Sequence, residues 1–230
     1  MTTAAILRVP QFSIRFLPVW RRNLLVWKKL AVPSVIGNIA EPLITLVAFG
    51  YGLGSMIGQV QGLPYIVYLA SGSLAVSGAL AATFEGLYSA YSRMEVQKTW
   101  ESIMNAPIAL DDIVFAELLW ASIKSMFTVA AILVVLFVLG ISREPTMVLA
   151  LPVLWLTGVT FASIALVFNA LARGYDFFTY YFTLVMTPMT FLSGVYFPID
   201  QMPSVLQGLA HALPLTHAVA LVLTRRRFFK

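Results

Sequence analysis

The stretch that decides the fold is TMVLALPVLWLTGVTFASIALVFNALA, residues 146–172, which contains no charged side chain. As a helix it is about 40 Å long, at 1.5 Å per residue, and therefore long enough to cross roughly 30 Å of hydrocarbon with some tilt. A helix satisfies its own backbone hydrogen bonds, as any segment inside a bilayer must. The stretch therefore predicts a transmembrane helix.

The composition extends this prediction to the whole chain. Its 230 residues are 60% hydrophobic and 11% charged, with a mean hydropathy of +0.86, so a soluble core would lack enough polar surface to cover it. We predict an all-α polytopic membrane helix bundle, with too little chain left over for a separate soluble catalytic domain. The expected membrane domain covers 32–230, and its five spans are 32–57, 63–91, 113–141, 146–172 and 177–199. The segment 204–223 is expected to be either a re-entrant hairpin or a sixth span.

Residues 1–31 are expected to form a separate N-terminal element, with an amphipathic helix over 11–31. Apolar residues recur there at steps of three and four, whereas bases recur at steps of seven and point the other way. The apolar set is Leu17, Trp20, Leu24 and Trp27, and the basic set is Arg15, Arg22 and Lys29. Tryptophan beside Arg and Lys favours a helix in the headgroup plane over a merely basic tail. No cleavable secretory signal is evident.

The distribution of bases predicts the orientation of the chain. With the N-terminus inside, nine bases lie on the inner side and one, Arg143, lies in the outer loops before residue 200. The nine are Arg8, Arg15, Arg21, Arg22, Lys28, Lys29, Arg93, Lys98 and Arg173. This bias predicts a cytoplasmic N-terminus, and it explains the basic excess without nucleic-acid binding.

The largest inner loop, 92–112, is expected to contain a short amphipathic helix. Ser92 and Glu95 fit a capping box at its start, and Asn105 and Pro107 fit its end. Its apolar face would consist of Val96, Trp100, Ile103 and Met104. Periodicity alone leaves open whether this face lies against lipid or docks into a groove on a partner.

Two acids lie within predicted spans, Glu41 before Pro42 and Glu85 near the inner end of the second span. Intramembrane acids often mark a substrate or ion path, but neither has an evident basic partner in the sequence. We therefore favour a structural or gating role over proton coupling. Glu117 and Lys124 share a helix face, and we expect Lys124 to snorkel to the interface instead of forming a buried ion pair.

Motifs for covalent chemistry are absent from the sequence. There is no cysteine, and two histidines do not make a convincing metal site. No glycine is followed by lysine, so no P-loop is present, and neither H-E-x-x-H nor G-x-S-x-G occurs. We therefore expect no enzyme activity and no cofactor in this chain.

Three stretches carry a family resemblance: EPLITLVAFGYGLG (41–54), TFEGLYSAYSRMEVQKTWESIMNAPIALDDIVFAELLW (83–120), and FLSGVYFPIDQMP (191–203) with LPLTHAV (213–219). The chain resembles the permease subunit of type-2 ABC exporters, most closely the nodulation protein J group, which handles lipo-oligosaccharides. The resemblance implies a homodimer with a P-loop ABC ATPase that binds ATP and Mg, and an amphiphilic glycan-lipid substrate. The residues of the implied ATPase-coupling helix are Arg93, Glu95, Val96, Trp100, Ile103 and Met104.

The stretch 191–203 is expected outside, where it would end the fifth span and fold back into the outer leaflet. Gly194, Pro198 and Pro203 interrupt the helix there, and backbone at membrane depth belongs beside a cavity. The expected translocation path or gate consists of Glu41, Glu85, Tyr196 and Phe197. The family usually has a sixth span, which we expect this sequence to lack. The alternative functions are a stand-alone secondary transporter or channel for small amphiphiles, or a membrane-embedded transferase.

Overall fold

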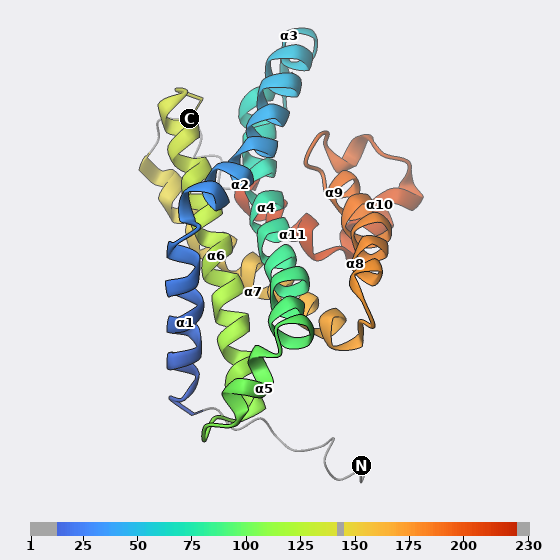
Figure 1. The fold of residues 1–230 in the computed structure, drawn as a ribbon. Coiled ribbons are helices and arrows are strands. Elements are labelled where there is room, and N and C mark those ends of the chain that lie inside the picture. Colours follow the sequence, from blue (N-terminus) through green and yellow to red (C-terminus); the bar gives the residue numbers. More distant parts are fainter. Residues whose placement is uncertain (1–12, 142–144, 225–230) are drawn as a thin grey trace.

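The computed structural model describes residues 13–141 and 145–224 (Figure 1). Arg8, Arg143 and the three arginines at 225–227 lie outside the described residues. The predicted all-α membrane bundle is confirmed: four helices of the described part are long and apolar enough to cross a membrane, or up to five if a bent pair counts as one span. The four are Ala31–Ile57, Tyr65–Val96, Leu110–Val138 and Val148–Leu171.

The first span runs from α2 (Ala31–Thr45) through the π-helical segment η2 (Leu46–Leu53) into α3 (Gly54–Ile57), at one end of the molecule in Figure 1. A hairpin of β1 (Gln59–Val60) and β2 (Leu63–Pro64) follows, where the loop between the first two predicted spans was expected. Gln61 and Gly62 both have positive φ, which is the backbone requirement of a tight two-residue hairpin turn.

The second span is the centre of the bundle. It joins α4 (Tyr65–Phe84) to the π-helical segments η3 (Glu85–Ser89) and η4 (Ser92–Val96), and 89% of its most apolar window is buried, against 11% for the first span. Small residues in the sequence LASGSLAVSGALAA (69–82) let neighbouring backbones approach closely, as in other membrane helix contacts. The first span therefore keeps an open face while the second is enclosed.

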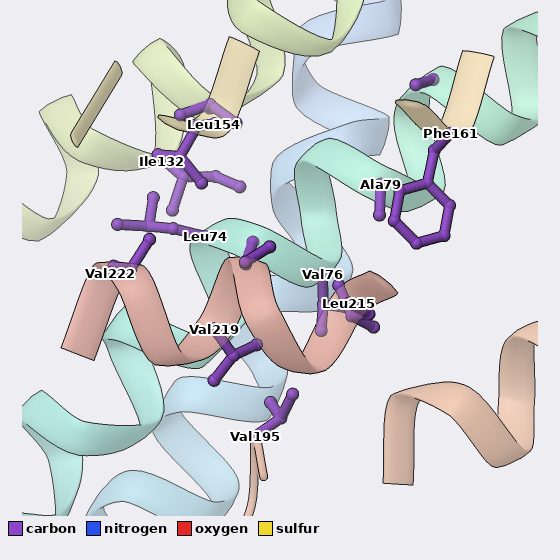
Figure 2. Close-up of a cluster of buried hydrophobic side chains, with 14 of the residues drawn as sticks. Leu74, Val76, Ala79, Ile132, Leu154, Phe161, Val195, Leu215, Val219 and Val222 are labelled. Atoms are coloured by element: carbon purple, nitrogen blue, oxygen red, sulfur yellow. The ribbon is translucent and has the colours of Figure 1, made fainter. Parts of the chain in front are cut away.

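Three helices enclose α4: α6 (Leu110–Val138), α7 (Leu151–Leu171) and α11 (Pro214–Thr224). A short 3-10 segment, η5 (Pro145–Ala150), leads into α7. Figure 2 shows one part of the shared core, where Leu74 of α4 lies beside Ile132 of α6. The core is mainly aliphatic with some aromatic rings, and it is held by close packing of side chains.

The helix α1 (Phe16–Lys28) runs alongside the first half of α6 (Figure 1). The ring of Phe16 lies 4.9 Å from Phe115, and that of Trp27 lies 4.9 Å from Phe127, so the two helices run in the same direction. The predicted apolar face is displaced: Val19 and Asn23 are buried whereas Leu17 is exposed. The helix forms as its periodicity predicts, but the side of α1 that packs against α6 is rotated relative to the predicted apolar face.

The predicted fifth span is shorter than expected. It comprises α8 (Tyr175–Tyr181), η6 (Phe182–Met186) and α9 (Thr187–Leu192), and it ends at Leu192 instead of near residue 199. Gly194 follows with φ 76°, a conformation that glycine adopts without a steric penalty. Beyond it lie η7 (Ile199–Gln201), α10 (Ser204–Ala212) and α11, and α10 and α11 meet at 92°. The segment 204–223 is therefore not one straight helix.

The turn after Leu192 is fastened to α4 through its backbone. The Tyr68 hydroxyl donates a hydrogen bond to the Gly194 carbonyl (2.6 Å), and the Tyr65 hydroxyl donates one to the Tyr196 carbonyl (3.1 Å). Gly72 permits close contact with this turn, because a Cβ there would lie 3.0 Å from the Cα of Val195. This backbone clamp fixes the turn against the central helix.

Candidate functional site

The loop 92–112 holds a shorter helix than the sequence predicts. Ser92 lies in η4, which continues the second span, and it does not cap a new helix. The chain turns at Lys98, whose positive φ of 50° separates the helix of the second span from α5 (Thr99–Met104). The predicted capping box is therefore wrong, because the span helix continues through Ser92 and Glu95. The start of α6 is capped instead by Asp112, whose carboxylate accepts a hydrogen bond from the Ala109 N–H (3.3 Å).

The predicted apolar face of this helix is divided between two environments. Trp100 is buried with Val19 and Ile113, and Ile103 packs against the same cluster. Val96 and Met104 remain exposed. The indole of Trp100 therefore attaches α5 to the bundle, and only the other side of α5 is available to a partner.

The exposed side of α5 also carries a charged group. Lys98 forms ion pairs with Glu95 (3.0 Å) and Glu101 (3.3 Å). Hydrogen bonds to these two carboxylates raise the pKa of Lys98 above its ordinary value, which extends its charged range on the alkaline side. The outward face of this corner is therefore a mixture of fixed charge and exposed apolar side chains.

Behind α5 lies a cluster of two buried acids and two partly buried bases, from here the charge cluster: Glu85, Arg93, Glu117 and Lys124. The Arg93 guanidinium bridges both acids, with Nη2 2.9 Å from Glu85 Oε1 and Nε 2.9 Å from Glu117 Oε1. Lys124 Nζ lies 2.5 Å from Glu85 Oε2. Both acids are only 2% exposed, and buried charges are tolerated when they are paired in this way.

Two tryptophans complete the hydrogen bonding of the charge cluster. Trp120 Nε1 donates to Glu85 Oε1 (2.8 Å), and Trp100 Nε1 donates to Glu117 Oε1 (3.4 Å). Trp100 thus links α5 to Glu117 of α6, and Arg93 links Glu117 to Glu85 of the second span. The short helix is connected to both spans through one continuous polar network.

The backbone around Glu85 is held by α7. The Asn169 side-chain nitrogen donates to the carbonyls of Gly86 (2.8 Å) and Leu87 (3.1 Å), which lie in the π-helical segment η3. Gly86 lets α7 approach, because a Cβ there would lie 2.7 Å from that of Ala165. Helical bulges of this kind often occur at functional positions.

The structure corrects two sequence interpretations here. Glu85 has two basic partners, and Lys124 forms a buried ion pair instead of snorkelling to the interface. The sequence signal for this cluster is the spacing of Glu117, Trp120 and Lys124, which places the three side chains on one face of α6. The resemblance assigns Arg93 to the coupling helix, whereas the structure places it in η4 at the end of the second span, where its guanidinium bonds Glu85 and Glu117.

The residues predicted for the translocation path separate into different places. Glu41 and Tyr196 line one cavity of about 580 Å³, which lies between α2, α4, α6 and the η6–α9 segment. Hydroxyl and amide groups also line it, and one of them, Asn38, donates to Thr128 Oγ1 (3.2 Å). Glu85 lines a different cavity, and Phe197 lines neither of the two. Within the described ranges, no three His, Cys, Asp or Glu side chains are grouped to hold a metal ion.

Comparison with known proteins identifies the family. The family model for the ABC-2 type transporter matches residues 15–224. Nodulation protein J of Sinorhizobium fredii is 45% identical over 93% of this chain and 82% of its own length, and that of Rhizobium leguminosarum bv. trifolii is 46% identical over 96% and 85%. The inner membrane transport permease YadH of Escherichia coli is 22% identical over 88% of this chain and 78% of its own length. No solved structure matches the chain.

These matches confirm the resemblance drawn from the three sequence stretches. The long apolar helices of the described part are those of a membrane-spanning subunit. The chain belongs to the ABC-2 type transporter family: it is a membrane-spanning ABC permease, and a separate ATPase partner hydrolyses the ATP.

Proposed function

We propose that this permease forms a homodimer that exports a lipid-linked or lipid-modified oligosaccharide across the bacterial inner membrane. Its N-terminus is cytoplasmic in this proposal, and α5 is the coupling helix that the ATPase receives. ATP and Mg bind to the partner ATPase. The nodulation protein J relatives support this proposal for the whole chain.

The observation that carries the proposal is the connection from α5 to the charge cluster. A helix of six residues has little stability of its own, but Trp100 fixes this one to Glu117. A displacement of α5 by an ATPase would therefore move α6 and, through Arg93, the second span. Coupling of this kind needs a packed element that moves as a unit, and the buried ion pairs supply one.

The cavity beside Glu41 is the proposed translocation path. Its Ser, Thr and Asn side chains can bond sugar hydroxyls, and Phe191 and Tyr196 stack at 5.3 Å and offer aromatic faces. A second permease that packs against the open face of the first span would close the other side of this path. An amphiphile needs both kinds of surface, which is why we favour a glycan-lipid over a small ion.

Paired intramembrane charges would also fit a stand-alone secondary transporter, which was the alternative from the sequence. The family match decides against it, because members of this family work with a separate ATPase. In this protein we assign the charge pairs to coupling.

Co-purification with a co-expressed ABC ATPase partner tests the coupling role. We expect Met104→Asp to abolish capture of the ATPase, because it places a charge on the exposed apolar side of α5. Met56→Asp is the control: Met56 is more exposed than Met104 (83% against 41%), and it lies in α3, at the opposite end of the molecule (Figure 1). Equal capture by both variants would contradict the assignment of α5.

Single-cysteine labelling tests the orientation, and the absence of native cysteine makes the background clean. Asp200→Cys and Glu101→Cys both place the thiol at an exposed site, one on each side in the proposed topology. A membrane-impermeant maleimide added to intact spheroplasts should label only the cysteine at 200. Labelling of the cysteine at 101 alone would reverse the proposed orientation.

A transport assay tests the cargo. Proteoliposomes that contain the permease and its ATPase should move a lipo-oligosaccharide, and Glu41→Gln should reduce that rate without reducing ATPase capture. Movement of the free oligosaccharide at the same rate would contradict the need for a lipid moiety.

A further inference from the structure

A second cavity, of about 510 Å³, lies between α1, the end of the second span and α6. Arg22, Asn23 and Trp27 line it from α1, and Arg93 and Lys124 line it from the other side. This cavity is separate from the one that contains Glu41 and Tyr196. It is the more basic of the two.

The positive charges of this cavity are unequally compensated. Arg93 and Lys124 are neutralised by Glu85 and Glu117 within the charge cluster. Arg22 forms no ion pair with any described residue, and its guanidinium donates only to the side-chain oxygen of Asn23 (3.2 Å). One positive charge is therefore left over at the wall of the cavity.

The electrostatic environment of Arg22 is unfavourable for its own charge. Burial lowers the pKa of its guanidinium, the nearby positive charge of Arg93 lowers it further, and Glu117 offsets part of this effect. An anion beside Arg22 would reverse this balance, because opposite charges at short range stabilise each other most where water is partly excluded.

Asn23 gives an independent indication of a missing partner. Its side chain is only 4% exposed, and its Nδ2 has no hydrogen-bond partner among the described residues, although its oxygen accepts from Arg22. Buried amide nitrogens are nearly always bonded, and Asn23 lines this cavity, so an acceptor that enters beside Arg22 would satisfy a donor that the described residues leave unpaired. A guanidinium and an amide N–H₂ side by side are donors suited to a phosphate.

The edge of the cavity is apolar. Val26 and Leu30, which also line it, are both more than half exposed. Exposed aliphatic side chains next to a buried cationic site suit a ligand with a charged head and hydrocarbon tails.

We propose that this cavity binds the phosphate of an anionic phospholipid, with Arg22 and Asn23 as donors and the acyl chains along Val26 and Leu30. The lipid would fill the space between α1 and the charge cluster and so support the contact of α1 with α6. A soluble phosphate offers the same oxygens but gains nothing from the apolar edge, and the test separates the two sources. The proposal concerns binding by the permease alone and does not depend on the exported substrate.

Native mass spectrometry of the full-length permease in neutral detergent tests the site, with phosphatidylglycerol, phosphatidylcholine and inorganic phosphate titrated separately. We expect selective retention of phosphatidylglycerol and an affinity loss of about tenfold in Arg22→Gln, equivalent to ~1.4 kcal/mol. Arg21→Gln is the matched control, because Arg21 is the adjacent base on α1, exposed and outside the cavity. Equal affinity of both variants for phosphatidylglycerol would overturn the proposal, as would binding of inorganic phosphate as tight as that of the lipid.

A second measurement needs no variant and covers the case in which Arg22→Gln does not fold. Trp27 and Trp120 both line the cavity, so a lipid there lies next to two fluorophores. Brominated phosphatidylglycerol should quench the wild-type tryptophan fluorescence more strongly than brominated phosphatidylcholine at equal mole fraction. Equal quenching by the two lipids would overturn the assignment.

Discussion

Replacement of Arg93 by methionine should destabilise the permease more than any exposed charge deletion. Arg93 is 14% exposed and bonds both acids of the charge cluster. After its loss Glu85 keeps Lys124 and Trp120, whereas Glu117 keeps only the long hydrogen bond from Trp100 (3.4 Å). A buried carboxylate that loses its ion-pair partner typically costs about 3–5 kcal/mol. For a chain of this length that corresponds to a fall of roughly 6–20 °C in the unfolding midpoint.

The assay is thermal unfolding of the purified permease in detergent, followed by tryptophan fluorescence. The double variant Arg93→Met/Glu117→Gln should recover at least half of the lost midpoint, because it removes the stranded charge but keeps an oxygen for Trp100. Lys98→Met is the control for a general charge effect: Lys98 also bridges two acids, but in solvent, where such pairs contribute little. It should leave the midpoint unchanged.

Two results would refute this reasoning. If Arg93→Met and Lys98→Met gave the same midpoint, the cluster would not depend on its central guanidinium. If the double variant were no more stable than Arg93→Met, the loss would arise from packing and not from the stranded carboxylate of Glu117.

Glycine positions give the remaining predictions. Gly86→Ala should lower the free energy of unfolding by about 1–3 kcal/mol, because its Cβ would lie 2.7 Å from that of Ala165. Adding Ala165→Gly should restore the stability. Gly52→Ala is the control in the same thermal assay and should have no such effect, because the space around Gly52 is open. Gly194→Ala should cost about 1–2 kcal/mol because of its φ of 76°, whereas Gly208→Ala, inside α10 with nothing within 4 Å, should be neutral or stabilising. A Gly194→Ala midpoint equal to that of Gly208→Ala would contradict the backbone argument.

The spans could be predicted because they depend on local composition. An uncharged stretch as long as 146–172 has few alternatives to a transmembrane helix, and the structure gives Val148–Leu171. Gly194 likewise marks a helix end by its own conformational freedom, although the position of that end at Leu192 was missed. Local chemistry does not specify how far a helix continues once neighbours support it.

The charge cluster could not be predicted in the same way. Glu85 and Lys124 are 39 residues apart, and only the packing of α6 against the second span brings them together. The capping box at Ser92 and Glu95 failed for a related reason: the motif is favourable at a helix start, but here the preceding helix had not ended. The rotation of the α1 face was set by α6, which the period of α1 alone does not reveal.

The backbone clamp has a consequence for how this protein can change over evolutionary time. Tyr65 and Tyr68 grip main-chain oxygens of the turn, and every amino acid supplies those oxygens. Side chains along the turn, apart from Gly194 with its positive φ, can therefore diverge from one lineage to another while the loop keeps its position. If the cavity beside Tyr196 carries the cargo, as proposed above, the cargo preference can change through point substitutions without rebuilding the scaffold that presents them.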